Sequence, residues 1–481
     1  MSVGGGCRAP AYSRRDVPAT RWSLSPVEPE TAAAAEPAVP APEGLRRCLG
    51  PVAVTAQAVA TIGLTLTAVI NIPEAMRSAG RATWISYAIA LGAVLLVSET
   101  LVLFRRLPAR PSGIAGYVEA GLGPRPAAAA SWALLLGYGA SLLACLAFFG
   151  FYLDRLLQHA GLPAAHVVGF LVGGLACFEL ARRDVKLSTH TMLVTESISV
   201  LIVVALTLLV VRHGGPARDL RALDPVGDSF AQVRSGLMVA VLSFIGFESA
   251  ANLGSEAVRP ERVVPRAMRT AVLTAGLLFL FWAVFLPEGL GWLAAPQRLS
   301  LDPVSDLADR LGQPGAGLWI KVGAFLCLFG SSLGSLTALA RVTYGLAADR
   351  VLPQRLARVH PTFGTPAAAL AGVALPVIGG GALLLQRGLS ASQAFDRFGG
   401  FAVLAFLLVY GLVALSSLRA PLPGSSRRRR LLVGGGCLLA VGAIALGYLS
   451  SVVGQENGML LSFAVLLLVG LLRVWRAVPA A

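Results

Sequence analysis

The sequence predicts an all-α polytopic membrane protein with about twelve transmembrane helices. The chain has 481 residues, 56% of them hydrophobic, and a mean hydropathy of +0.72, whereas soluble domains average roughly 45 to 50% apolar residues. The apolar residues form runs of about 20, the length that crosses a bilayer. The runs lack the alternating pattern of a membrane β-barrel. Because backbone groups in lipid must be hydrogen-bonded within the segment, we expect helices.

Twelve spanning segments are predicted, and short loops rich in arginine, glycine or proline separate most of them. They are expected at residues 51–72, 82–104, 127–157, 164–181, 191–211, 236–254, 266–286, 317–348, 366–385, 395–418, 431–453 and 459–472. Residues 1–48 are rich in Ala, Pro, Glu and Arg, which predicts a disordered tail. This tail has no apolar core, so it is not a secretory signal peptide.

The basic residues indicate the orientation of the chain in the membrane. They gather in the N-terminal tail and in alternate loops, where the main clusters are Arg105, Arg106 and Arg110; Arg182, Arg183 and Lys186; Arg259, Arg262, Arg266 and Arg269; and the run 427–430. Because cytoplasmic loops carry an excess of arginine and lysine, both termini are predicted to be cytoplasmic. The expected location is the cytoplasmic membrane, with the lipid bilayer as partner.

Composition also excludes several classes of function. The net charge is +15, but the arginines lie between apolar runs and not along one face of a soluble fold, so nucleic-acid binding is not expected. The six cysteines and five histidines are scattered without metal-ligand spacing, which predicts neither a metal centre nor a disulfide framework. None of the common catalytic motifs is present, so the chain is not expected to be an enzyme.

A carboxylate, Glu248, lies in the middle of the sixth predicted span, directly after Phe244, Ile245, Gly246 and Phe247. A charge at this depth is costly and is kept where it faces a cavity, a partner or freed backbone groups. Gly246 supplies the backbone freedom for an interrupted helix, the device by which secondary transporters expose backbone groups to a substrate. The alternative is that Glu248 caps a neighbouring helix without a role in transport.

The first predicted span is also interrupted by polar and helix-weakening residues, namely Thr61, Gly63, Thr65, Thr67, Asn71 and Pro73. Two interrupted spans at corresponding positions of two halves indicate a transporter binding site. They predict a five-plus-five inverted repeat in residues 49–212 and 213–418, followed by two further helices in 419–481. The alternative is that Thr65 and Thr67 only bond back to the preceding helical turn.

Three long motifs, together with these spans, resemble the amino acid–polyamine–organocation (APC) permeases. Residues 243–268, SFIGFESAANLGSEAVRPERVVPRAM, are similar to the sixth helix and following loop of that family. Residues 331–366, SSLGSLTALARVTYGLAADRVLPQRLARVHPTFGTP, resemble its eighth helix and the loop after it. Residues 105–124, RRLPARPSGIAGYVEAGLGP, resemble the loop before its third helix. The resemblance covers most of residues 51–418, and the last two helices match only as apolar spans.

The resemblance implies a LeuT-like fold in which helices 1 and 6 are discontinuous and hold an amino acid or related amine. Half-helix ends would bind the substrate carboxylate through N–H groups and its ammonium through carbonyls. The positions carried over as substrate-binding are Thr65, Leu66, Thr67, Ala68, Phe244, Ile245, Gly246 and Phe247. Leu66 and Ala68 stand where the family commonly has glycines, and the sequence shows no obvious buried acidic pair for a polyamine. Both observations favour a neutral or small amino acid over a polyamine. Phe244 or Phe247 could stack on an ammonium or could simply pack in the core.

Two alternatives exist for the coupling ion, and neither needs another cofactor. Glu196, on the fifth predicted span, and Glu248 are intramembrane carboxylates that could carry a proton, which is the favoured reading. By resemblance, Ser199 stands where some family members carry a lysine in place of a sodium ion. Its hydroxyl, with those of Ser331 and Ser332, could bind sodium, because hard cations prefer oxygen ligands. Simple exchange also stays open.

Arg341 belongs to the eighth-helix motif and is assigned to gating. It could pair with Asp349 at an inner gate, or the two could form an ordinary surface pair. The sequence therefore predicts a permease for amino acids or related small amines that works by alternating access. The alternatives are a polyamine carrier or exchanger on the same fold and a membrane sensor that does not transport.

Overall fold

The computed structural model describes residue 45 and residues 47–107, 113–163, 165–213, 230–311, 315–422, 424–454 and 456–478. Almost all of the predicted tail, residues 1–48, lies outside this range, as do residues 108–112 of the motif at 105–124. Within the described residues the secondary structure is helical, with one isolated bridge between Leu49 and Ala257. Ten segments are long and apolar enough to span a membrane.

The twelve predicted spans all coincide with helices. The first of the ten segments, Pro51–Leu103, contains two predicted spans, and an 18-residue helix, α7, lies over the predicted span 164–181. The unbroken long helices are α4 (Thr83–Leu103), α6 (Pro124–His159), α7 (His166–Arg183), α8 (Val185–Arg212), α10 (Pro260–Gly291), α13 (Ala316–Ala348), α14 (Ala367–Gln386), α15 (Ala391–Arg419), α16 (Arg427–Val452) and α17 (Asn457–Ala477). The predicted all-α polytopic membrane fold is confirmed.

The predicted first and sixth spans are both interrupted, as expected. The first consists of α1 (Pro51–Ile62), the three-residue α2 (Leu64–Leu66), a π-helical turn (Thr67–Asn71) and α3 (Ile72–Ala79). The sixth consists of α9 (Phe230–Phe244) and a 3₁₀ helix, η4 (Phe247–Glu256). The breaks fall at Gly63, with φ of 72°, and at Gly246, with φ of 117°. Both values lie in the region that glycine adopts without steric cost.

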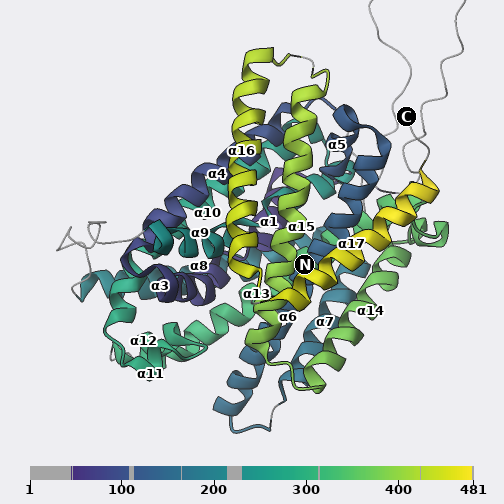
Figure 1. Ribbon diagram of the computed structural model, residues 1–481. Coiled ribbons are helices and arrows are strands. Elements are labelled where there is room, and N and C mark those ends of the chain that lie inside the picture. Colours follow the sequence, from purple (N-terminus) through teal and green to yellow (C-terminus); the bar gives the residue numbers. More distant parts are fainter. Residues whose placement is uncertain are drawn as a thin grey trace, which may run out of the picture. The chain divides into compact units, whose positions relative to one another are not determined.

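Shorter helices cap the bundle. They are α5 (Ala115–Leu122), α11 (Ala295–Arg298) and α12 (Pro303–Arg310). In Figure 1, α11 and α12 lie at one end of the bundle, and the turn between α15 and α16 lies at the other. A local signal marks the start of α15, where Ser390 forms a capping box. Its hydroxyl accepts a hydrogen bond from the Gln393 N–H, and its own N–H donates to the Gln393 side chain.

The burial of the helices separates a core from a lipid-facing rim. Helices α6, α13 and α15 are the most buried spans, while α16 and α17 are the least. Leucines on the outer helices are largely exposed, for example Leu439 on α16 at 78% and Leu461 on α17 at 66%. Apolar side chains on the outside are the expected surface of a helix bundle in lipid, because the surrounding solvent is itself apolar. The two interrupted helices lie in the core, where they contact α8, α10 and α13.

Candidate functional site

The break in the first span is held by a carboxylate from α8. After Gly63 the chain resumes as a helix, so the first N–H groups lack helical partners. The Leu64 N–H donates to Glu196, with 2.6 Å between Leu64 N and Glu196 Oε1. The Leu66 N–H points at the Cys327 sulfur of α13, 3.2 Å away. Glu196 is only 3% exposed, so this contact links α8 and the broken first span inside the bundle.

Two hydroxyls extend the same link. The Thr65 hydroxyl donates to Ser199 Oγ at 3.0 Å, and the Ser199 hydroxyl donates to the Glu196 carbonyl at 2.9 Å. Thr67 instead bonds back to the Gly63 carbonyl, at a long 3.5 Å. The structure thus brings Thr65 and Ser199 together, whereas Thr67 makes the local bond that was the alternative for both threonines.

A serine of α13, Ser331, lies at the same break. A Cβ placed on Gly63 would lie 2.7 Å from Ser331 Oγ. Ser331 and Ser332 are fully buried. Within the described residues, neither hydroxyl has a hydrogen-bond partner, and Glu196 Oε2 has none either. Buried oxygens without partners are costly unless something satisfies them, and oxygen ligands of this kind suit a proton or a sodium ion.

The break in the sixth span is held by a different carboxylate. Glu248 Oε1 accepts the Tyr138 hydroxyl at 2.9 Å, and Oε2 accepts the Tyr410 hydroxyl at 2.7 Å and the Gly246 N–H at 3.1 Å. The tyrosines come from α6 and α15. Three donors on one buried carboxylate fix its position, because hydrogen bonds to a charged acceptor are the stronger kind. Glu248 therefore joins the η4 start to two core helices.

The aromatic residues beside this break lie in the packed core. Phe244 is 1% exposed and stacks edge-on against Phe279 at 4.9 Å between ring centroids. Phe247 is fully buried and lies 6.0 Å from the Tyr410 ring. The remaining predicted substrate-binding residues are also buried: Thr65, Leu66, Thr67, Ala68, Ile245 and Gly246. The two breaks touch, since a Cβ on Gly246 would lie 2.7 Å from the carbonyl of Thr61.

Arg341 lies in a buried ion pair with a partner that the sequence did not suggest. Its guanidinium donates to both oxygens of Glu256, at 3.0 and 2.8 Å, and both side chains are 3% exposed. The expectation of a pair with Asp349, or of a surface pair, is wrong, because Arg341 points into the bundle. Beside this pair, the N–H groups of Cys48 and Leu49 donate to the Glu256 carbonyl, which ties the chain before α1 to the end of η4.

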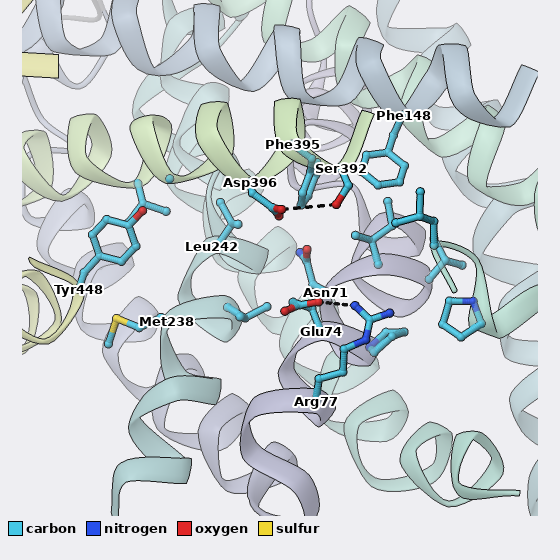
Figure 2. A pocket seen from close by; sticks show the side chains of 18 residues that line it. Asn71, Glu74, Arg77, Phe148, Met238, Leu242, Ser392, Phe395, Asp396 and Tyr448 are labelled. Atoms are coloured by element: carbon cyan, nitrogen blue, oxygen red, sulfur yellow. Dashed lines mark hydrogen bonds and ion pairs between the residues drawn. The ribbon is translucent and has the colours of Figure 1, made fainter. Parts of the chain in front are cut away.

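A pocket lies at the ends of the broken spans that are opposite the Glu256–Arg341 pair. It has a volume of about 240 Å³. Its lining residues come from the π-turn, α3, α6, α9, α12 and the chain just before it, α15 and α16. Figure 2 shows Asn71, Glu74 and Arg77 on one side of it and Ser392 and Asp396 on the other. None of the predicted substrate-binding residues lines this pocket. In this conformation they lie in the closed core next to it.

Sequence reasoning missed four residues of these networks: Tyr138, Tyr410, Cys327 and Glu256. Glu256 carried a usable signal, since it is the acidic residue before the Pro260 turn in the sixth-helix motif. The other three carried none, because each stands in an apolar span with no pattern that relates it to Glu196 or Glu248.

Comparison with known proteins agrees with the earlier resemblance. Residues 49–479 match the family model for amino acid permeases. The chain is 26% identical over 395 residues to Cationic amino acid transporter 4 of Mus musculus, covering 77% of this chain and 59% of that protein. It is 30% identical over 325 residues to an uncharacterized transporter of Mycobacterium tuberculosis, covering 66% of this chain and 68% of that one.

A third relative is the low-affinity putrescine importer PlaP of Escherichia coli (strain K12), which is 26% identical over 333 residues. The alignment covers 67% of this chain and 71% of that protein. The chain thus spans 59% of the length of the mouse relative and about two thirds of the other two.

Proposed function

This chain belongs to the amino acid permease family, and from that premise we propose that it is a secondary transporter of amino acids or related amines in the cytoplasmic membrane. The substrate would bind where the first and sixth spans break, in contact with the residues at 65–68 and 244–247. The observation that carries the proposal is the pair of breaks at Gly63 and Gly246, which touch in the core. Broken helices at mid-membrane are how such transporters present backbone groups to a substrate.

Alternating access needs one side closed while the other is open. The Glu256–Arg341 pair and the contact between Leu49 and the end of η4 close one side. The pocket beside Asn71 is open at the opposite ends of the same broken helices. With both termini in the cytoplasm, as the arginine-rich loops favour, the closed side is cytoplasmic and the pocket faces outward.

Glu196 is the residue that we assign to proton coupling. Its Oε1 accepts the Leu64 N–H at the break, and its buried Oε2 has no partner in the described part of the chain. Protonation at Oε2 would remove the buried charge. It would also weaken the bond to Leu64, because a neutral acid is a poorer acceptor than a carboxylate. Proton binding would then loosen the first span at the point where it must move.

Glu248 has a different role in this proposal. Both of its oxygens are occupied, by Tyr138, Tyr410 and the Gly246 N–H. A carboxylate that is fixed by three donors anchors the hinge of the sixth span and does not exchange a proton in the cycle. Sodium coupling through Ser199, Ser331 and Ser332 is the competing possibility, and the two unpartnered hydroxyls of α13 are the observation that favours it.

The test is uptake into proteoliposomes that contain the full chain. Labelled L-alanine, L-lysine and putrescine are supplied with an imposed proton gradient, an imposed sodium gradient, or neither. We expect proton-driven accumulation of at least one label. Glu196→Gln should abolish accumulation but retain exchange of label at equal pH, whereas Glu248→Gln should reduce both. Sodium-driven accumulation that survives in Glu196→Gln would refute the proton assignment.

The same experiment separates transport from sensing. A folded native chain that binds a label without accumulating or exchanging it would be a sensor. Thermal unfolding of each purified variant checks that a loss of uptake is not a loss of fold.

A further inference from the structure

The pocket beside the broken spans has a charge that the proposed transport cycle does not use. Two acidic side chains, Glu74 of α3 and Asp396 of α15, and one basic side chain, Arg77 of α3, line it. Two carboxylates and one guanidinium give the described lining a formal charge of −1. Figure 2 shows Asp396 on one side of the pocket and Glu74, together with Asn71, on the other.

Arg77, the single arginine of the described lining, already has partners on the protein. Arg77 forms an ion pair with Glu74, one turn earlier on α3. Its other terminal nitrogen donates to the Ser300 carbonyl at 2.9 Å, which ties α3 to the chain before α12. Among the described residues, Arg77 therefore forms its ion pair with Glu74 and not with Asp396.

Asp396 is the uncompensated charge. It is exposed to the pocket, and its partner in the described structure is the Ser392 hydroxyl, at a long 3.4 Å. No lysine or arginine among the described residues forms an ion pair with it. A carboxylate in this setting has room for a cationic partner that the protein itself does not supply.

Asn71 gives an independent indication of a ligand. The residue is only 3% exposed, and its Nδ2 donates to Ser243 Oγ at 3.0 Å. Its Oδ1 accepts no hydrogen bond from any residue that the structure describes, and Figure 2 shows the amide pointing into the pocket toward Asp396. An amide oxygen that points into the pocket without a donor from the described residues can accept a hydrogen bond from an N–H group of a ligand.

The remaining wall is apolar and aromatic, with Phe148, Leu242, Phe395 and Tyr448 among its members. Such a wall accommodates a short methylene chain, and aromatic faces attract cations. The volume of about 240 Å³ suits a small molecule.

We propose that this pocket binds an alkylammonium group between Asp396, the Asn71 carbonyl oxygen and Glu74, and that it selects substrates with a cationic side chain or a second amine. This inference rests on the proposed transport function and narrows its substrate class. It revises the expectation of a neutral or small amino acid, which was based on Leu66, Ala68 and the lack of a visible acidic pair. The acidic pair of Glu74 and Asp396 could not be recognised in the sequence, because the two residues lie more than 300 positions apart.

The experiment measures equilibrium binding and uptake of three probes by the full chain: putrescine, L-lysine and L-alanine. Asp396→Asn removes the charge at an exposed position and should leave the fold intact. We expect it to weaken putrescine or L-lysine binding about tenfold or more, the effect of losing one charge-assisted contact, with L-alanine unchanged. The probe that shows the larger loss identifies the source of the ammonium, a diamine or a basic amino acid.

Two further variants keep the test decisive. Glu288→Gln removes an acid near the end of α10 that does not line the pocket, and it should behave like the native chain. Asn71→Leu should weaken cation binding in the same direction as Asp396→Asn. Cation affinity that is unchanged in both Asp396→Asn and Asn71→Leu overturns the inference. A native chain that carries L-alanine but neither cation also overturns it and leaves the transport proposal standing, whereas failure of all three probes defeats both.

Discussion

Glu256 and Arg341 lie 85 positions apart in the sequence and form a two-bond ion pair in which each side chain is 3% exposed. The pair joins the end of η4 to α13, next to the chain that leads into α1. Its burial matters because each charge is out of water and depends on the other for compensation.

Glu256→Gln should therefore destabilise the protein strongly. The variant leaves the Arg341 charge buried and unpaired, which costs about 3 to 5 kcal/mol. The control is Glu99→Gln, which weakens the contacts with Arg269 and Arg429. All three side chains are 34% to 46% exposed, so the cost should be about 0 to 1 kcal/mol. Thermal unfolding of the detergent-solubilised variants measures both. Equal unfolding temperatures for the two variants would contradict the prediction.

Gly246→Ala should abolish transport and lower stability more than Gly63→Ala. Both positions have positive φ, which costs an alanine about 1 to 2 kcal/mol. At Gly246 the new methyl would also lie 2.7 Å from the backbone of Thr61, which cannot move aside alone, whereas at Gly63 it would meet the rotatable Ser331 hydroxyl. Gly92→Ala, at a helical site with nothing within 4 Å, is the control for uptake and unfolding. A Gly246→Ala variant with native uptake would show that the break is not needed.

Tyr410→Phe should weaken the anchor of the sixth span. The change removes the 2.7 Å hydrogen bond to Glu248 Oε2, and the lost donor to a buried carboxylate costs about 1 to 3 kcal/mol. Tyr344→Phe is the matched control, because this buried tyrosine on α13 donates no hydrogen bond to any of the described residues. Unfolding in detergent should separate the two variants by several degrees. If Tyr344→Phe proves the more damaging of the pair, the anchor role is wrong.

Asp302 should make stability depend on pH. It lies in the loop before α12, outside the spanning segments, where burial raises its pKa from 3.8 to about 6 against the lowering effects of Ser305, Lys321 and Tyr152. The Tyr152 hydroxyl of α6 donates to it at 3.2 Å, and Lys321 of α13 lies 3.7 Å away. The nearby carboxylate of Asp306 raises the pKa of Asp302 further, because the two negative charges repel each other.

A carboxyl with a raised pKa stabilises the fold while it is protonated. This contribution is complete below the unfolded pKa of 3.8 and is lost as the pH rises through about 6. The native chain should therefore lose about 1 kcal/mol relative to Asp302→Asn between about pH 5 and about pH 7.5. Paired unfolding curves across that range measure the difference. A constant difference would mean that Asp302 does not titrate there.

Local sequence predicted the spans and both interruptions well, for physical reasons. Hydropathy over about 20 residues is decided by the residues of the segment itself, since each helix meets lipid or apolar neighbours. Gly63 and Gly246 were marked as weak points, and both adopt positive φ.

The partners of the buried charges could not be predicted in the same way. Glu248 was marked as a functional carboxylate, but its partners Tyr138 and Tyr410 lie 110 and 162 positions away. Glu196 was marked as a proton carrier, and its contact with Leu64, 132 positions away, was not foreseen. Any apolar span can hold a tyrosine or a free N–H group, so the pairing depends on how the helices pack.

The sequence alone thus determined that the chain is a polytopic helical membrane protein of the amino acid permease family, with two weakened spans and two intramembrane acids. Those properties follow from composition and order along the chain. The tertiary structure decided that Glu196 holds one break and Glu248 the other, that Arg341 pairs with Glu256, and that Asp396 and Asn71 face one pocket. These are contacts between distant segments, and their geometry is set only when the helices are packed against one another.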